Sequence, residues 1–394
     1  MSASSVIFQA NVSTVQSKTN SRFVVLDMLR GIAMLLMALD HAAYFSRSGI
    51  AAESYDCIKP ELESWPHILS GILTNIATPI FYVLAGSSVA FFEASRRNRG
   101  WTEWQITRFL LVRAVVLFLL DALLVVGVYQ SPPTLSVLSA VGVALVMLAF
   151  LRRLPVWVVT LVGFILIVVV FPTGLYLMAG IVQEMGLAEF STQYPLLKLL
   201  FLQNTSVFPP VQYPILGWPP LGLVGYVFGR LLINRKITLS FKIGWLGVAG
   251  LGIWFILRLV RGYGNFLPYQ SDWEPVYFII QNKQPPSLVY ILFYLSLALL
   301  ILAALLRFQR LILPTVIGHI LTVFGQTALF FYAAHLLIYG LIIPRILPSQ
   351  TVFVGRGLIR CYLAFVLGIL ILYPLCIGYR KLKRTHPNSV LRFL

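Results

Sequence analysis

The first long apolar segment holds ionisable side chains whose types and spacing could do chemistry. The segment reads RFVVLDMLRGIAMLLMALDHAAYF and contains Asp27, Arg30, Asp40 and His41. Charged groups at membrane depth are costly unless they are paired or hydrated, so these side chains are candidates for function. An imidazole titrates near neutrality and can take a proton from an attacking hydroxyl or amine. Acyl transfer requires this kind of proton removal.

The spacing places three of these side chains on one face of a helix. At about 100° per residue, the eleven steps from Arg30 to His41 return to within roughly 20° of the same direction. The rise of about 1.5 Å per residue separates the two side chains by about 16 Å. Asp27 and Arg30 lie three residues apart and can form an ion pair. We therefore expect one polar stripe, although an interfacial anchor at Asp27 and Arg30, with His41 capping the helix, would give the same pattern.

Two more ionisable residues fall inside later apolar segments. His335 is expected at a depth from which it could approach His41, where it would bind an acceptor or share the proton. A lone intramembrane histidine is also common as a hydrogen-bonding residue between helices. Asp121 needs a partner at membrane depth, either an arginine or a hydroxyl, and a structural role accounts for it best. The catalytic candidates are His41 and His335.

Arginines cluster in the loop EASRRNRGWTEWQITR and just beyond it. Guanidinium groups pair bidentately with phosphates, such as those of coenzyme A. Cytoplasmic loops of membrane proteins are also basic for topological reasons alone. The candidates for binding a phosphate-bearing cofactor are Asp27, Arg30, Arg96, Arg97, Arg99 and Arg113.

The elements that position these residues are membrane helices. The 394 residues are 59% hydrophobic and 11% charged, and the mean hydropathy of +0.86 is far above that of a soluble domain. Each crossing needs roughly 20 mostly apolar residues, and the periodicity predicts an all-α, polytopic bundle of about ten membrane helices. The expected helices are 23–44, 67–92, 108–129, 134–151, 155–179, 213–232, 240–259, 287–306, 323–342 and 357–379. A short interfacial helix at 314–325 would add an eleventh element.

The charge distribution predicts the orientation of this bundle. Clusters of cations at 96–99, 152–153 and 380–384 fall in loops that the positive-inside rule assigns to the cytoplasm, and both termini fall on the same side. Arg258 is among the exceptions. The long loops 45–66, 180–212 and 260–286 are then outside, where they could cover a site. We expect a flexible cytoplasmic tail at 1–21, a single membrane domain at 22–380 and a basic cytoplasmic tail at 381–394.

Composition also narrows the partners. The formal charge of +17 lies in short loops between apolar segments, so a lipid bilayer rather than nucleic acid is the expected partner. Cys57, Cys361 and Cys376 are far apart in sequence without metal-ligand spacing, so we expect neither a disulfide framework nor a metal site. No nucleotide-binding glycine motif and no zinc-protease motif is present in the sequence.

The opening LDMLRGIAMLLMALDH, with ten residues between arginine and histidine, resembles the first helix of the transmembrane acyltransferases that decorate polysaccharides and lipids. Within that superfamily the chain is most similar to the heparan-α-glucosaminide N-acetyltransferase branch, which has many bacterial members. Further pieces agree in order along most of the chain. They are TPIFYVLAGSSVAFF, RFLLVRAVVLFLLDALLV, PILGWPPLGLVGYVFGR, QPPSLVYILFYLSLALL and GQTALFFYAAHLLIYG.

The resemblance implies that acetyl-CoA or another acyl-CoA enters from the cytoplasm and that a carbohydrate or glycolipid acceptor waits outside. Arg30 would lie toward the donor and His41 at the point of transfer. The lysosomal branch carries its functional histidine in the lumenal segment after the first span, whereas residues 42–66 contain none, which leaves His41. The resemblance also implies a bacterial cytoplasmic membrane, and a homodimer is compatible with it. A proton-coupled transporter, a lipid flippase or an inert scaffold could carry the same intramembrane stripe.

Overall fold

The computed structural model shows an all-α membrane protein, as the sequence predicts. The structure describes residues 3–47, 50, 53–234, 240–347, 357–386 and 389, and the side chains of residues 3–23 are outside this description. The expected tail at 1–21 falls on that part of the chain and stays a prediction. At the other end, α16 (Gly357–Thr385) continues into the expected basic tail, so that residues 381–385 are helical.

The helices follow one another along the whole described chain. They are α1 (Ala3–Ser46), α2 (Trp65–Asn75), α3 (Ala77–Arg97), α4 (Glu103–Leu124), α5 (Val137–Leu151), α6 (Val156–Ile165), α7 (Phe171–Met185), α8 (Leu187–Gln193), α9 (Pro195–Phe201), α10 (Leu221–Ile233), α11 (Ser240–Val260), α12 (Leu288–Ile312), α13 (Val316–Gln326), α14 (Ala328–Leu337), α15 (Ile343–Ile346) and α16. Short π-helical segments at Val125–Tyr129, Leu166–Val170 and Ile338–Ile342 extend α4, join α6 to α7 and join α14 to α15.

Within the described residues, seven helical stretches are long and apolar enough to cross a membrane. They are Trp65–Arg97, Glu103–Tyr129, Val156–Met185, Ser240–Val260, Leu288–Ile312, Ala328–Ile346 and Gly357–Thr385. The shorter apolar helices α5, α10 and α13 pack among them. The polytopic architecture is therefore confirmed.

Two breaks differ from the expected helices. The span expected at 67–92 is divided at Ile76 into α2 and α3. Pro79 lacks the amide hydrogen that would bond to the Asn75 carbonyl, and the Tyr290 hydroxyl donates to that carbonyl instead. The second break is at Thr327, between α13 and α14, where the threonine hydroxyl donates to the Val323 carbonyl one turn back. Such bonding to a preceding carbonyl bends helices.

Helix α13 matches the short helix expected at 314–325, but it packs along α1 within the bundle and is not confined to the interface. A side chain at Gly31 would collide with the Leu321 carbonyl, and one at Gly325 would collide with the Asp27 carbonyl. The two glycines thus permit the backbones to touch. Because of this close approach, the break at Thr327 places the end of α13 directly beside the polar stripe of α1.

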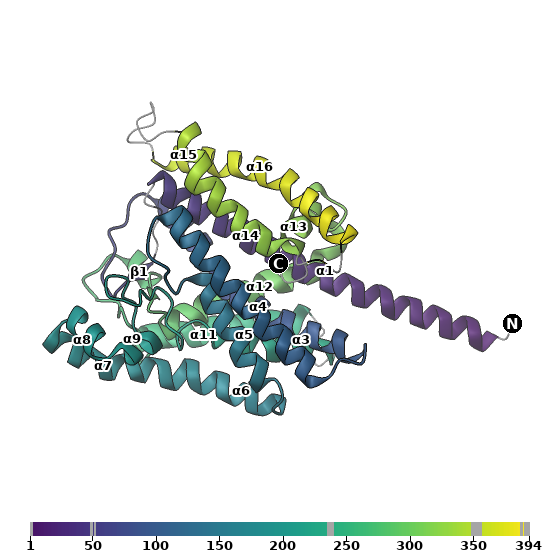
Figure 1. Cartoon of the computed structure of the whole chain (residues 1–394), viewed down its shortest axis with the longest axis horizontal. Helices are drawn as coiled ribbons and strands as arrows, with labels where there is room; N and C mark the ends of the chain where they lie inside the picture. The colour runs from purple at the N-terminus through teal and green to yellow at the C-terminus, as the bar shows by residue number, and fades with distance from the viewer. Residues whose placement is uncertain are drawn as a thin grey trace.

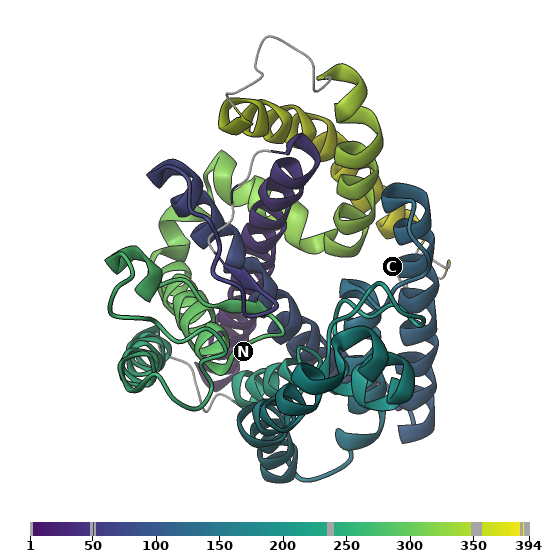
Figure 2. The ribbon, with the colours of Figure 1, turned by 90° about the vertical axis from the view of Figure 1, so that its left-hand side faces the viewer.

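A layer of loops covers one end of the bundle. Strand β1 (Ser54–Tyr55) pairs in parallel with β2 (Asn282–Gln284), and this pairing joins two of the three long loops. The buried Arg258 guanidinium orders the loop at 260–286. It donates to the carbonyls of Leu267, Tyr277, Phe278 and Ile280 and to the Asn265 side chain. In Figure 1 this layer lies beside α8 and α9, whereas the N-terminal part of α1 projects from the opposite end. Seen from the loop layer, the helices surround the central axis of the bundle (Figure 2).

Candidate active site

The polar stripe of α1 begins with an ion pair that three helices share. The Arg30 guanidinium lies 2.8 Å from the Asp27 carboxylate. It also donates to the Ser88 hydroxyl on α3 at 3.0 Å and to the Gly325 carbonyl on α13 at 3.2 Å. The Gln326 amide donates to the second Asp27 oxygen at 3.3 Å. The predicted Asp27–Arg30 pair is therefore present, and it fixes the guanidinium where α1, α3 and α13 meet.

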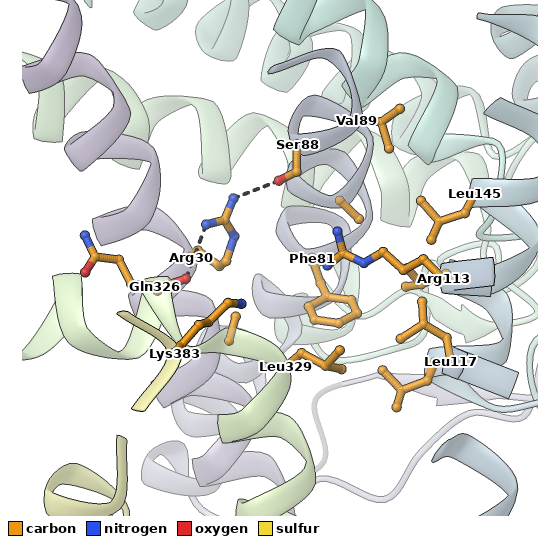
Figure 3. A pocket seen from close by; sticks show the side chains of 15 residues that line it. Arg30, Phe81, Ser88, Val89, Arg113, Leu117, Leu145, Gln326, Leu329 and Lys383 are labelled. Atoms are coloured by element: carbon orange, nitrogen blue, oxygen red, sulfur yellow. Dashed lines mark hydrogen bonds between the residues drawn. The ribbon is translucent and has the colours of Figure 1, made fainter. Parts of the chain in front are cut away.

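Arg30 lines a cavity of about 190 Å³ together with two further cations. Figure 3 shows Arg30 from α1, Arg113 from α4 and Lys383 from α16 reaching it from different sides. The Nε of Arg113 is buried and has no hydrogen-bond partner among the described residues. We call this space the Arg30 cavity. Three cations line the cavity, and one of them, Arg30, pairs with the Asp27 carboxylate. The cavity therefore has a net positive charge that suits an anionic ligand.

The other predicted arginines do not reach this cavity. Arg97 pairs with Glu93 at 2.7 Å and with Glu103 at 2.6 Å. Arg96 lies over the rings of Phe92 and Trp101, and Arg99 is exposed. Their binding of a cofactor stays a prediction. The buried Arg152, which also contacts Glu93 and Glu103, completes an ion network at the ends of α3 and α4.

Farther along α1, His41 meets His335 of α14. The Nδ1 of His41 lies 3.4 Å from the Nε2 of His335, and the two rings are nearly perpendicular. The expected approach of the two histidines is therefore confirmed. His335 is fully buried, and its other nitrogen, Nδ1, lies 3.1 Å from the Phe331 carbonyl.

The neighbouring carbonyls determine where the protons of this pair lie. A carbonyl can only accept, so the Nδ1 of His335 must donate to Phe331, which leaves the Nε2 of His335 as an acceptor. The Nδ1 of His41 is 2.9 Å from the Met37 carbonyl and must likewise carry its proton, which it shares with His335. The Nε2 of His41 is then unprotonated and has no hydrogen-bond partner among the described residues. This tautomer is inferred from the partners of each nitrogen, and it is the one a general base requires.

His41 faces a polar cavity of about 600 Å³ under the loop layer. This volume falls within the range of small-molecule sites. Asp40 and Lys283 share the wall with His41, and exposed Tyr44 and half-exposed Tyr55 contribute aromatic surface. A smaller extension of about 50 Å³ continues past His41 toward the middle of the bundle. We call the larger space the His41 cavity and the smaller one its inner extension.

Lys283 had no role in the sequence prediction. Its ammonium lies 3.1 Å from the Glu53 carboxylate, which also accepts from the Asn75 amide and the Tyr55 hydroxyl. Burial acts to lower the pKa of Lys283, but the charge of Glu53, assisted by Tyr55 and Asp40, raises it well above its ordinary value. Lys283 lies in a loop that the charge distribution assigns to the outside, so it is an exception to the positive-inside rule. That exception is the signal that could have found it.

The remaining intramembrane acid has a structural role. Asp121 accepts from the Ser136 hydroxyl at 2.6 Å and from the backbone amides of Ser136 and Ser139 at 3.1 and 3.0 Å. Its carboxylate therefore caps the N-terminus of α5, and the expected hydroxyl partner is confirmed. Of the three cysteines, Cys361 and Cys376 are buried and Cys57 is an exposed free thiol. Among the described residues no group of three or more histidine, cysteine or acidic side chains could hold a metal ion.

One comparison with known proteins bears on this site. A family model described as "Heparan-alpha-glucosaminide N-acetyltransferase, catalytic" matches residues 22–259, which is more than half of the chain. No curated protein matches the chain. The matched range contains Arg30, His41 and Arg113, whereas His335 and Lys383 lie beyond it. The site therefore combines residues inside and outside the matched segment.

Proposed function

Because the chain belongs to the heparan-α-glucosaminide N-acetyltransferase family and is a membrane acetyltransferase, we propose that it moves the acetyl group of cytoplasmic acetyl-CoA across the bilayer to an acceptor outside. The acceptor is an amine or hydroxyl of a carbohydrate or glycolipid. One observation carries this proposal: a cationic cavity and a histidine pair lie along the same helix, α1, about eleven residues apart. The donor needs the first feature and the transfer step needs the second.

The Arg30 cavity is the proposed donor site, open toward the cytoplasm. The phosphates of coenzyme A would be held by Arg30, Arg113 and Lys383, whose side chains line it. The Nη1 of Arg30 donates to the Asp27 carboxylate and to the Gly325 carbonyl, and its Nη2 donates to the Ser88 hydroxyl. These bonds fix the orientation of the guanidinium. A fixed cation binds an anion without first losing side-chain entropy, which favours tight donor binding.

The transfer step follows from the tautomer of His41. Its Nε2 accepts the proton of the acceptor's amine or hydroxyl while the acceptor nitrogen or oxygen attacks the thioester carbonyl carbon. The carbon–sulfur bond breaks as the new carbon–nitrogen or carbon–oxygen bond forms, and the coenzyme A thiolate takes the proton back from His41. His335 holds the Nδ1 proton of His41 and stabilises the imidazolium formed during the step. A direct transfer of this kind needs no redox partner; a relay through an acyl-histidine would use the same residues.

One feature favours a transport function. The breaks at Ile76 and Thr327 resemble the discontinuous helices of transporters, whose half-helices meet at a central binding site. A transporter of an anionic substrate could use the cationic cavity too, so the cavity alone does not separate the two functions. A transporter would move its substrate without acetyl-CoA, so dependence on the thioester separates the two functions.

The test uses the full chain, purified in detergent and reconstituted in liposomes. Radiolabelled acetyl-CoA is the donor probe and glucosamine is the acceptor probe. We expect label to move to glucosamine with wild type, to be lost with His41→Ala, and to require much more acetyl-CoA with Arg30→Ala. Thermal shifts with coenzyme A measure donor binding separately, and Arg30→Ala should lose the shift whereas His41→Ala should keep it. Unchanged transfer by His41→Ala would remove His41 from the mechanism.

A further inference from the structure

Phe81 of α3 is the residue that borders both spaces of the proposed site. Its side chain lines the Arg30 cavity and also the inner extension of the His41 cavity. Figure 3 shows its ring near Leu329 at the boundary of the Arg30 cavity. No other residue lines both the Arg30 cavity and either His41 space in the described part of the chain. Phe81 therefore lies at the boundary between the space at Arg30 and the space at His41.

The ring is held in place by aromatic neighbours. Its centroid is 6.0 Å from that of Tyr332 on α14, with the planes 30° apart, and 6.1 Å from that of Tyr82. Tyr332 in turn packs edge-on to His335. Aromatic rings at such separations attract one another beyond the effect of the area they bury. The position of the Phe81 ring is therefore coupled to the histidine pair through Tyr332.

The space beyond the ring is small. The inner extension holds about 50 Å³ between Phe81 and His41, whereas the His41 cavity beyond it holds about 600 Å³. Its other walls include Met34 and Met37 of α1 and Thr78 of α3. A short acyl group is the kind of ligand that fits such a space. Each added methylene would have to displace the Phe81 ring or the helix backbones beside it.

We propose that Phe81 determines which acyl group the enzyme transfers, by limiting the size of the thioester's acyl chain that reaches His41. This inference rests on the proposed function, since it concerns the donor of that same reaction. A smaller side chain at position 81 joins the two spaces and admits longer chains. Selectivity against one extra methylene in an apolar pocket is about 10–200-fold, so loss of the ring should alter the preference between donors strongly.

The test compares acetyl-CoA with hexanoyl-CoA as donors and uses glucosamine as the acceptor probe, with free coenzyme A measured by a thiol reagent. We expect Phe81→Ala to raise the ratio of hexanoyl to acetyl transfer by about tenfold or more, with Phe81→Leu in between. The matched control is Phe330→Leu, because Phe330 stacks on Tyr379 and lines none of these spaces. Its ratio should equal that of wild type.

The outcomes are separable. An unchanged ratio in both Phe81 variants, with acetyl transfer intact, overturns the role of Phe81 and leaves the proposed function standing. Absence of transfer from either donor by the wild-type protein overturns the proposed function itself. If Phe81→Ala does not fold, Phe81→Leu keeps the ring's removal testable, since leucine preserves most of the packing.

Discussion

Replacing His335 with glutamine tests whether this residue is a base or a positioning residue. Its Nε2 accepts from the Nδ1 of His41 over 3.4 Å, a long bond between neutral rings that contributes at the lower end of about 0.5–1.5 kcal/mol. When His41 takes the acceptor's proton, the same contact becomes charge-assisted and contributes about 1.5–3 kcal/mol. The difference between the two states is about 1–2.5 kcal/mol, and it is the largest effect expected on the barrier, because the glutamine amide oxygen can replace part of the lost acceptor.

A loss of this size lowers kcat by about 5- to 70-fold at most, because each 1.4 kcal/mol of barrier is a factor of about ten. By contrast, removal of a general base costs about 10²–10⁴-fold, so His41→Ala should be the far more damaging variant. The Michaelis constant for acetyl-CoA should not change with His335→Gln, since the Arg30 cavity does not include this residue. Partial unfolding would also lower the apparent kcat at constant KM, so the rate is expressed per mole of folded protein.

The assay is the initial rate of acetyl transfer to glucosamine at saturating acetyl-CoA, with the melting temperature of each variant recorded alongside. His319→Gln on α13 is the matched control, because it makes the same replacement at an exposed histidine. Its rate should equal that of wild type. If His335→Gln were as inactive as His41→Ala while keeping its melting temperature, His335 would be a catalytic residue and the assignment of protons above would be wrong.

Three other variants or probes test separate parts of the structure. Lys383→Gln should raise the Michaelis constant for acetyl-CoA by up to about fivefold, which is the effect of about 1 kcal/mol for a partly exposed charge pair. Lys381→Gln, at a residue outside the cavity, should leave the Michaelis constant unchanged. Equal Michaelis constants for the two variants would remove Lys383 from the donor site. Asp121→Asn should lower the free energy of unfolding by about 1–3 kcal/mol, because one carboxylate oxygen of the α5 cap becomes an amide nitrogen, and an unchanged melting temperature would contradict the cap. Cys57 should be the thiol that a membrane-impermeant maleimide labels from outside. Because burial and then the charge of Asp56 raise the pKa of this thiol to about 11, labelling should increase about tenfold per pH unit between pH 7 and 9. Labelling from the cytoplasmic side would show that the predicted topology is inverted.

The sequence was most informative about α1. Helical periodicity alone placed Asp27, Arg30 and His41 on one face, and the structure shows the first two paired and the third at a cavity. Periodicity works here because one continuous helix carries all three residues. The meeting of His41 with His335 was also expected from depth, since two titratable groups at one level of a small bundle have few other partners.

What the sequence could not provide was the approach of separate helices. Lys383 lines the Arg30 cavity because α16 packs against α1, and no pattern within α16 indicates that contact. Arg113 was a predicted cofactor-binding residue, but only the structure shows that it shares a cavity with Arg30. The break at Ile76 was missed for a related reason, because its hydroxyl-to-carbonyl bond comes from a tyrosine that is more than two hundred residues away in the chain. The break before α14 was expected in part, since the sequence already indicated a separate short helix at 314–325.

The arginine cluster shows the opposite case, in which sequence proximity misleads. Arg96, Arg97 and Arg99 are close to Arg113 in the chain, but they lie at or just beyond the end of α3, whereas Arg113 lies inside α4. Glu93 is fully buried and needs cations around it, and the Arg97 and Arg152 guanidinium groups fill that requirement. Composition counts charges but cannot assign them to partners, so a basic loop alone says little about phosphate binding.

A membrane acyltransferase must let a thioester reach the far side without opening a path for water and ions, and the placement of Phe81 is consistent with that constraint. The cationic and imidazole ends of the stripe are separate spaces rather than one continuous channel, and an aromatic ring lies where they meet. An apolar ring at that point adds a barrier to hydrated ions, which pay a large cost for losing water, whereas a thioester pays much less. The same ring can therefore keep the bilayer sealed and restrict the acyl chain, so a variant that widens donor selectivity at position 81 should also leak protons in liposomes.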